Sequence, residues 1–373
     1  MTATRADYPR CKEVLKEIIN CNFDLKLVVT GSHLSKKFGN SISEILKDKI
    51  PIHAKIKILH DNFNTHLDMA KSMAKLSNEF AKILDNLKPD LVLLTVDRFE
   101  TLACASIASV MNFPIAHIQG GEVTGTVDES IRHAVSKLSH LHFVANKDAQ
   151  KRLIKLGEER KFVFNVGCPF IDVIKETKLL NKKELFKKFQ LSLSKKTILF
   201  VQHPVTTEYL KTNNHIEISL KAISSFKNVQ IISIMSNFDA GSNFINKKIS
   251  KLKKKITFIP NLNNEIYLSF LKNVDVMVGN SSSAVREAPS FRLPCVNIGS
   301  RQNGRLMAKN VINVDNELSQ IIKAINKSLY NEKFKNSLKT IKNPYGNGNS
   351  SKKILKILKE IDLSNITQKK ITY

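Results

Sequence analysis

The sequence predicts an α/β protein with two doubly wound domains, and two observations carry this prediction. Apolar runs of strand length alternate with amphipathic segments along nearly the whole chain, which is typical of parallel sheets covered by helices. The length of 373 residues also exceeds that of one ordinary domain. A lysine-rich stretch, 174–196, separates two such alternating blocks. We therefore expect domains at residues 1–175 and 176–350, followed by a helix and tail at 351–373.

In the first block, runs rich in Leu, Ile and Val predict strands, and apolar residues spaced three and four apart predict helices. The strands are expected at residues 24–29, 90–95, 114–118, 142–145 and 162–166. The helices are expected at residues 8–20, 66–87, 99–111, 130–138 and 147–156. Pro89 ends the helix at 66–87, because proline cannot continue a helix.

The first strand of this block is expected to be missing, or to be replaced by another segment of the domain. A doubly wound domain normally opens with a strand ahead of its first loop and helix. Here Met1 stands almost directly before the loop TRADY (residues 4–8). We predict that the central strand of the first sheet is absent or reduced to two or three residues, as a shortened reading frame would leave it.

The second block repeats the alternation. Its strands are expected at residues 197–202, 229–234, 256–259, 275–278 and 295–298. Its helices are expected at residues 263–272, from the loop at 279–283 to Pro289, at 315–330 and at 351–361.

The net charge of +26 raises the question of a nucleic-acid partner. The lysines are spread along helical stretches such as 182–188 and 247–255, without interleaved aromatic residues or a nucleic-acid motif. Solvated, lysine-rich helix faces are therefore the favoured interpretation, and no nucleic-acid partner is predicted. A positive field still attracts an anionic substrate.

The cysteines and the apolar runs bear on the compartment. Five cysteines, scattered and without a CxxC pair, predict reduced and mostly buried thiols instead of a disulfide framework or a zinc site. They are Cys11, Cys21, Cys104, Cys168 and Cys295. No apolar run reaches the roughly 18 residues that span a bilayer. The sequence thus predicts a cytoplasmic protein with no membrane partner.

Polar loops follow several predicted strands, where open α/β sheets bind their ligands. In the second block, Gly279–Ser283 has small side chains that let backbone N–H groups approach a diphosphate. Glu287, in the helix that follows, is placed to accept ribose hydroxyls, and Arg301 follows the next strand. His203 ends another strand of this block and is a candidate phosphate or uracil contact. The simpler interpretation makes Ser281 a helix cap and Glu287 a surface residue.

In the first block, carboxylates gather in or beside the loops after the strands. They are Asp97, Glu122, Asp128 and Glu129, with Arg98 beside the first. Clustered carboxylates push one another's pKa values apart, so one can act as an acid and another as a base. Taken alone, Asp128 is explained as a first-turn helix acid, and His117, inside a short strand, as a buried structural residue.

The same residues resemble a known family. The segments that carry the likeness run from residue 2 to about 315: TRADY, VTGSHLSKKFGN (29–40), DRFE (97–100), HIQGGEVTGTVDESIRHA (117–134), GCP (167–169), HPVT (203–206), NFDAGS (237–242), GNSSSAVREAP (279–289) and NIGSRQNGR (297–305). They are similar to the hydrolysing UDP-N-acetylglucosamine 2-epimerases of sialic acid biosynthesis.

The resemblance implies a GT-B fold, with UDP held in a cleft between two Rossmann-like domains. It implies that UDP-N-acetylglucosamine and water become N-acetylmannosamine and UDP, by anti elimination to a glucal and syn addition of water. It implies no cofactor and no metal, and a homodimer or homotetramer. Asp97 and Asp128 match catalytic carboxylates. The positions that match UDP contacts are Arg5, Arg98, His203, Asn237, Ser281, Ser282, Glu287 and Arg301.

Two substitutions depart from the family pattern. Gln119 stands where some members have a catalytic glutamate, so Glu122 or Glu129 must take that role, or the substrate differs. Val96 stands before Asp97, where the family usually has glycine.

Three alternative functions stay open from the sequence. The first keeps the chemistry and acts on UDP-N,N'-diacetylbacillosamine, towards legionaminic acid. The second is a GT-B glycosyltransferase, which needs an acceptor site in place of the carboxylate cluster. The third is an inactive UDP-binding relative.

Overall fold

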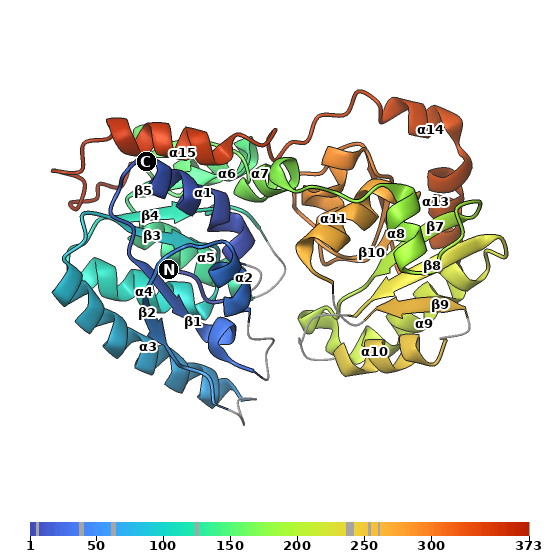
Figure 1. Ribbon diagram of the computed structural model, residues 1–373, viewed down its shortest axis with the longest axis horizontal. Coiled ribbons are helices and arrows are strands. Elements are labelled where there is room, and N and C mark those ends of the chain that lie inside the picture. The colour runs from blue at the N-terminus through green and yellow to red at the C-terminus, as the bar shows by residue number, and fades with distance from the viewer. Residues whose placement is uncertain are drawn as a thin grey trace. The chain divides into compact units, whose positions relative to one another are not determined.

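The computed structural model describes residues 1–4, 7–36, 41–60, 65–123, 127–235, 242–252, 255–259 and 262–372. The chain forms two compact units, and each has a parallel sheet with helices around it (Figure 1). This confirms the predicted α/β class with two Rossmann-like sheet groups. The first unit contains Met1–Val123, Val127–Lys175 and Tyr345–Tyr373, and most of the second is Glu176–Pro344. The helix and tail at 351–373 are therefore part of the first unit and not a separate segment.

The first unit has two groups of parallel strands. One pairs β1 (Leu27–Thr30) with β2 (Ile52–Ile56), and the other has the order β3-β4-β5-β6. The bounds of the second group are β3 (Val92–Thr95), β4 (Ile115–Ile118), β5 (Leu141–Val144) and β6 (Val163–Asn165). The helices are α1 (Tyr8–Asn20), α2 (Ile42–Lys47), α3 (His66–Leu87), α4 (Phe99–Val110), α5 (Val127–Leu138), α6 (Lys147–Lys155), α7 (Pro169–Glu176) and α15 (Ser350–Glu360).

Local sequence signals set the ends of these helices. At the start of α3, the Thr65 side chain accepts from the backbone of Asp68, and the Asp68 side chain accepts from the backbone of Thr65. At its end, Lys88 adopts a left-handed conformation with φ of 45°. Leu76, Phe80 and Leu84 form its buried stripe, as the helical spacing predicts.

The first strand, which was expected to be missing, is reduced to a single β-bridge. Thr2 pairs in parallel with Val29, and the Met1 amino group donates to the Leu93 carbonyl at 3.1 Å. Beside this bridge lies a cavity of about 680 Å³ between β1 and β3. Its walls come mainly from apolar residues of these strands, of α1 and α3, and of the segment that follows α15.

The second unit has one six-stranded parallel sheet in the order β12-β11-β10-β7-β8-β9. The bounds are β7 (Lys196–Val201), β8 (Val229–Ile234), β9 (Ile256–Ile259), β10 (Val276–Gly279), β11 (Cys295–Ile298) and β12 (Val311–Val314). The helices are α8 (Lys182–Lys188), α9 (Thr212–Ser224), α10 (Ser242–Ser250), α11 (Asn264–Asn273), α12 (Ser283–Arg286), α13 (Leu318–Tyr330) and α14 (Glu332–Ser337). The core lies between the sheet and α9, α10 and α13.

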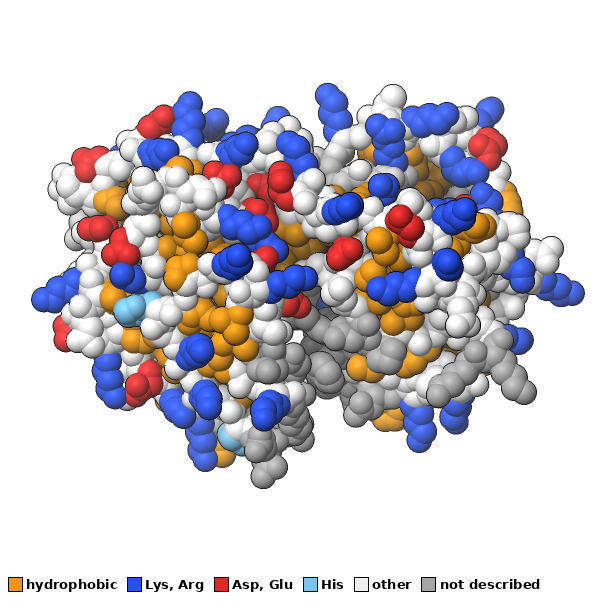
Figure 2. All heavy atoms as spheres, in the orientation of Figure 1, with side chains coloured by type: hydrophobic (Ala, Val, Ile, Leu, Met, Phe, Trp, Pro, Cys, Tyr) orange, Lys and Arg blue, Asp and Glu red, His pale blue; other side chains and the backbone are white. Residues whose placement is uncertain are grey.

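The surface and the thiols agree largely with the sequence analysis. Figure 2 shows Lys and Arg side chains spread over the visible face with acidic side chains among them. All five cysteines are free and four are buried, whereas Cys21 is half-buried. None of the helices in the described part of the chain has both the length and the apolar character needed to cross a bilayer. Within the same ranges, no three His, Cys, Asp or Glu side chains are grouped to hold a metal ion.

Candidate active site

A buried arginine connects the acidic loops of the first unit. Asp97 follows β3, Glu122 follows β4, and Asp128 lies in the first turn of α5. Arg132, one helical turn after Asp128, is 2% exposed and forms an ion pair with Asp97. The same guanidinium donates to the backbone oxygen of Glu122 at 2.7 Å. Because β3 and β4 are neighbours in the sheet, Arg132 fixes two adjacent loops to the helix that carries Asp128.

A second arginine, Arg98, lies between buried carboxylates. Its Nε donates to Glu100 Oε2 at 3.1 Å, and the Glu100 side chain is only 2% exposed. The charge of Glu100 raises the pKa of Arg98 most, with further contributions from Asp7 and Asp128. The carboxylate of Asp7 is itself held by the backbone N–H and the hydroxyl of Thr4. The guanidinium therefore stays charged and half-exposed, which suits it to an anionic ligand.

The sequence analysis did not single out Asp7 or Glu100. Both belong to segments that carry the family resemblance, TRADY and DRFE, so their signal was present without a role.

Asp128 and Glu129 differ in their surroundings although they are consecutive. Neighbouring helix positions project about 100° apart. The charge of Asp128 acts on Arg98, whereas Glu129 lies 3.7 Å from His133 and is 36% exposed at its side chain. Of the two, Asp128 is therefore the better candidate for chemistry.

Gln119 is buried and turned towards a thiol. It is 2% exposed and has a φ of 67°, and its Nε2 donates to Cys168 Sγ at 2.6 Å. Within the described ranges, its Oε1 has no hydrogen-bond partner. The side chain therefore acts as a donor in the packing after β4, a role that a carboxylate cannot fill.

Gln119→Glu is expected to lower the free energy of unfolding by about 1–3 kcal/mol, because it removes a donor and buries a carboxylate. Turnover should not rise. Thermal unfolding and the rate of UDP release measure the two effects, and Gln368→Glu, at an exposed position, is the matched control. A faster Gln119→Glu enzyme would instead show that a carboxylate here supports catalysis.

His117 and Val96 shape the same edge of the sheet. His117 is fully buried and its Nε2 bonds the Val96 carbonyl at 2.8 Å, which confirms the structural role predicted for it. Burial lowers its pKa to about 4, so the ring is neutral near pH 7. Val96 has a φ of 63°, a strained conformation for a β-branched residue. The strained turn leads directly into Asp97.

In the second unit, the ends of three adjacent strands, β7, β10 and β11, form a polar cluster. Asn280 Oδ1 accepts from the His203 backbone at 2.7 Å, and its Nδ2 donates to the His203 carbonyl at 2.8 Å. Gln302 and Arg301 donate to the Asn280 carbonyl at 2.8 and 3.3 Å. The candidate contacts His203 and Arg301 thus both bind Asn280, whose carbonyl also accepts from Gln302. The sequence analysis assigned no role to Asn280 or Gln302.

The glycine that opens this loop has no room for a side chain. Gly279 has a φ of 131°, and a Cβ there would lie 2.1 Å from the Val201 carbonyl oxygen.

Burial, assisted by the charge of Arg301, lowers the pKa of His203 to about 3. His203 is therefore a neutral hydrogen-bonding group near pH 7.

The helix after the serines is shorter than predicted. A helix reaching Pro289 was expected, but α12 is Ser283–Arg286, and a 3-10 turn, Ala288–Phe291, follows it. Ser282 precedes α12 without a side-chain cap, and Ser281 Oγ accepts from Ser283 N at 3.3 Å. With so short a helix, the backbone N–H groups and hydroxyls are the stronger anion donors, and the helix dipole adds little.

Tyr267 on α11 is a further member of this cluster that no sequence signal identified. Burial raises the pKa of its hydroxyl most and the nearby charge of Glu287 adds to this, while hydrogen bonds with Ser283 and Ser281 oppose it. Glu287 is 6% exposed, so the simpler interpretation of a surface residue is wrong.

Two predicted UDP contacts, Arg5 and Asn237, lie outside the described residues.

The chain is similar to known proteins over almost its whole length. It matches the family described as UDP-N-acetylglucosamine 2-epimerase over residues 16–359. It is 40% identical to the GDP/UDP-N,N'-diacetylbacillosamine 2-epimerase (hydrolyzing) of Campylobacter jejuni, covering 99% of this chain and 97% of the relative. It is 38% identical to the UDP-N,N'-diacetylbacillosamine 2-epimerase (hydrolyzing) of Legionella pneumophila, covering 97% and 95%.

The fold is also that of a solved structure. A crystal structure of UDP-GlcNAc 2-epimerase from Neisseria meningitidis, bound to UDP-GlcNAc, superposes with a TM-score of 0.84 at 20% identity. The similarity covers 96% of this chain and 98% of that one.

Proposed function

The chain belongs to the UDP-N-acetylglucosamine 2-epimerase family, as its motifs predict, and from this premise we propose that it is a hydrolysing UDP-sugar 2-epimerase. The observation that carries the proposal is the cluster around Arg132, which fixes Asp97 and the Glu122 backbone beside the helix of Asp128. A reaction that removes one proton and returns another needs such a set of positioned acids and bases.

The proposed reaction has two balanced steps. A carboxylate removes the proton at sugar C2 while the bond from C1 to the UDP oxygen breaks, which gives UDP and a 2-acetamidoglucal. Water then adds at C1 and a proton returns to C2 on the opposite face, which gives the free 2-epimer. We assign these proton transfers to Asp97, Glu122 and Asp128. A base must lie within hydrogen-bond reach of its proton, so acids held on two loops and on α5 allow proton transfer at C2 from different sides.

Nucleotide binding is assigned to the polar cluster of the second unit. The backbone and hydroxyls of Ser281 and Ser282 suit the diphosphate, and the buried Glu287 suits the ribose hydroxyls. Arg301 and the neutral His203 complete this set, and Arg98 of the first unit remains a predicted contact. Arg5 and Asn237 remain predicted contacts.

Two sugars are candidates for the substrate. UDP-N-acetylglucosamine is the sugar nucleotide in the family description. UDP-N,N'-diacetylbacillosamine is named for the relatives at 40% and 38% identity, and these relatives span nearly the whole chain. We favour the diacetylated sugar on this ground, while the catalytic steps are the same for both.

Incubation with each sugar nucleotide in D₂O, followed by NMR, tests the proposal. The expected result is release of UDP together with a free 2-epimerised sugar that carries deuterium at C2. UDP release without deuterium at C2 would indicate simple hydrolysis and exclude the elimination. Transfer of the sugar to an added acceptor would favour a glycosyltransferase, and binding without turnover an inactive relative. A parallel tube with the GDP-linked sugar checks the nucleotide.

A further inference from the structure

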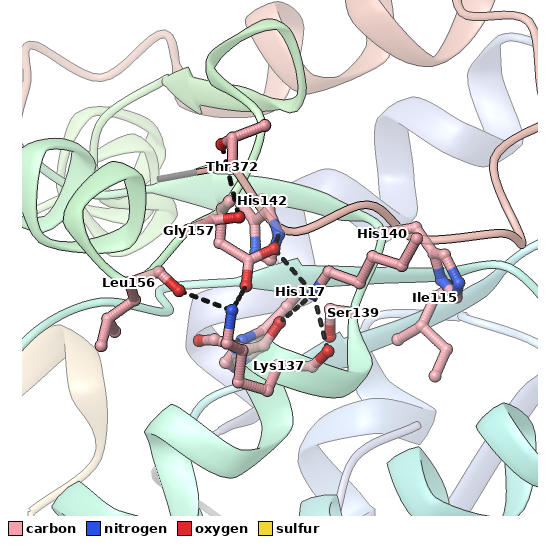
Figure 3. A network of polar contacts seen from close by, with 12 residues as sticks. Ile115, His117, Lys137, Ser139, His140, His142, Leu156, Gly157 and Thr372 are labelled. Atoms are coloured by element: carbon pink, nitrogen blue, oxygen red, sulfur yellow. Dashed lines mark hydrogen bonds and ion pairs between the residues drawn. The ribbon is translucent and has the colours of Figure 1, made fainter.

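The C-terminal segment that follows α15 packs on the first unit beside the end of α5. Ile366 is 7% exposed and belongs to the core that contains Leu141 and Phe143. The Thr372 backbone donates to the Gly157 carbonyl at 3.0 Å, and the Thr367 carbonyl lies 3.3 Å from His140 Nε2. Figure 3 shows Thr372 and Gly157 close to Lys137 and His142. The segment is therefore fixed at both its ends.

Lys369 lies between these anchors and caps α5. Its ammonium donates to the carbonyls of Ser136 and Lys137 at 3.0 and 2.6 Å. These carbonyls belong to the last turn of α5, where helix carbonyls lack partners within the helix. A cation at this end also interacts favourably with the helix dipole.

Glu158 joins this cap to the turn beyond α6. Its carboxylate binds Lys369 at 2.6 Å, Lys137 at 3.0 Å and His142 at 3.0 Å, and its side chain is 2% exposed. Lys137 also donates to the Leu156 carbonyl (Figure 3). Although burial alone raises the pKa of Glu158, hydrogen bonds from His142 and Lys369 lower it to about 2. The carboxylate therefore stays charged and holds both lysines over the wide pH range of an enzyme assay.

The other end of the same helix carries the chemistry. Asp128 is in the first turn of α5, and Arg132 binds Asp97 and the Glu122 carbonyl from the next turn. The helix also packs closely against the glycine turn, since a Cβ on Gly120 would lie 2.7 Å from Ser136 Oγ. A rigid helix moves as one body, so a shift at Ser136 and Lys137 displaces Arg132 and Asp128 by a similar amount.

We propose that Lys369 is a positioning residue for the epimerase reaction, which fixes α5 along its axis and thereby places Asp128 and Arg132. This inference rests on the proposed function. It assigns the C-terminal segment a role in turnover that goes beyond packing, because the contact acts on the helix that carries the acids.

Lys369→Met tests the proposal, since it keeps the side-chain length and removes the charge. The expected result is a fall in kcat of about 10-fold to 10²-fold, because small misplacements of catalytic groups have effects of this size. KM and UDP affinity should stay near wild type, since the proposed nucleotide contacts are mostly in the second unit. Lys369→Arg should restore part of kcat. Lys370→Met, which changes an exposed neighbour, is the matched control and should behave as wild type.

Amide hydrogen exchange in α5 separates the two hypotheses. Faster exchange in α5 of Lys369→Met, with the rest of the first unit unchanged, supports the positioning role whether or not a sugar nucleotide is turned over. A wild-type protein that turns over no sugar nucleotide contradicts the proposed function alone. An unchanged kcat in Lys369→Met, or unchanged α5 exchange, would overturn the role of Lys369, as would a rise in KM without a fall in kcat.

Discussion

Asp97→Asn and Asp128→Asn are each expected to lower turnover of the UDP-sugar by about 10²-fold or more, because a positioned general acid or base typically contributes 10²–10⁴-fold. UDP affinity should change little, since the proposed UDP contacts lie mainly in the second unit. Steady-state release of UDP measures turnover, and calorimetric titration with UDP measures affinity. Asp85→Asn, at an exposed position on α3, is the matched control and should retain full activity.

The two variants are expected to differ in stability. Asp97→Asn leaves the buried guanidinium of Arg132 without its ion-pair partner, and breaking such a pair typically costs about 3–5 kcal/mol. Asp128 is in the first turn of α5 and only half-buried, so Asp128→Asn should unfold closer to wild type. Thermal unfolding of both variants separates loss of chemistry from loss of fold. Near-normal turnover in a folded variant would assign that aspartate to structure.

The bounds of a helix were predictable where an apolar stripe and a signal for a helix end occur together. The bounds expected for residues 8–20 and 66–87 match α1 and α3, because each has a long apolar stripe and a strong signal at an end. Pro9 stands in the first turn of α1, and Thr65 forms a capping box with Asp68 ahead of α3. Such signals act within a few residues, so the sequence alone suffices to place them.

The strands β2 and β12 and the end of the helix α12 were not predictable in this way. The strand β2, with sequence IHAKI, exposes His53 and Lys55, and β12 is the four-residue VINV at the other sheet's edge. Edge strands bury fewer side chains, so their apolar pattern is weak. The helix α12 stops at Arg286 because the chain then turns into a 3-10 segment containing Pro289.

The candidate residues of the site could be picked out from the sequence, whereas most of the contacts that hold them in place could not. The motifs singled out Asp97, Asp128 and His203 as candidates, because these lie in or directly after loops that follow strands. They did not identify Asn280, which binds His203 across 77 positions of sequence. Only the pairing of strands brings such residues together, and pairing depends on the whole fold.

The cavity between β1 and β3 leads to the second large prediction. Among the described residues, no strand lies between β1 and β3, and Thr2 makes the one bridge to β1. The cavity of about 680 Å³ is lined by apolar side chains that include Leu15, Phe80 and Leu84. At its end the Met1 amino group is buried, and burial lowers its pKa. Both an apolar slot and a buried amine reduce the stability of the first unit.

Fusion of five apolar residues, Val-Ile-Leu-Val-Val, to the amino group of Met1 is therefore expected to stabilise the first unit. As a strand they span roughly 16 Å and can pair with the edges of both β1 and β3. Each buried side chain contributes about 1.5–3 kcal/mol, and ordering each backbone residue costs about 1–2 kcal/mol. With both contributions at mid-range, five residues give a net gain of about 4 kcal/mol, which corresponds to a rise in Tm of roughly 8–16 °C. Differential scanning calorimetry measures it.

A matched fusion of Ser-Asp-Ser-Asn-Ser separates filling of the slot from mere extension of the chain. Both fusions replace the free amine by a peptide bond, so the part of the gain that comes from the amine is common to them. Only the apolar fusion can fill the cavity, and it alone should protect the amides of Val28 and Leu93, which face the slot, from hydrogen exchange. Equal Tm values for the two fusions would show that the slot closes in solution without a strand, and that the separation of β1 from β3 has no cost in stability.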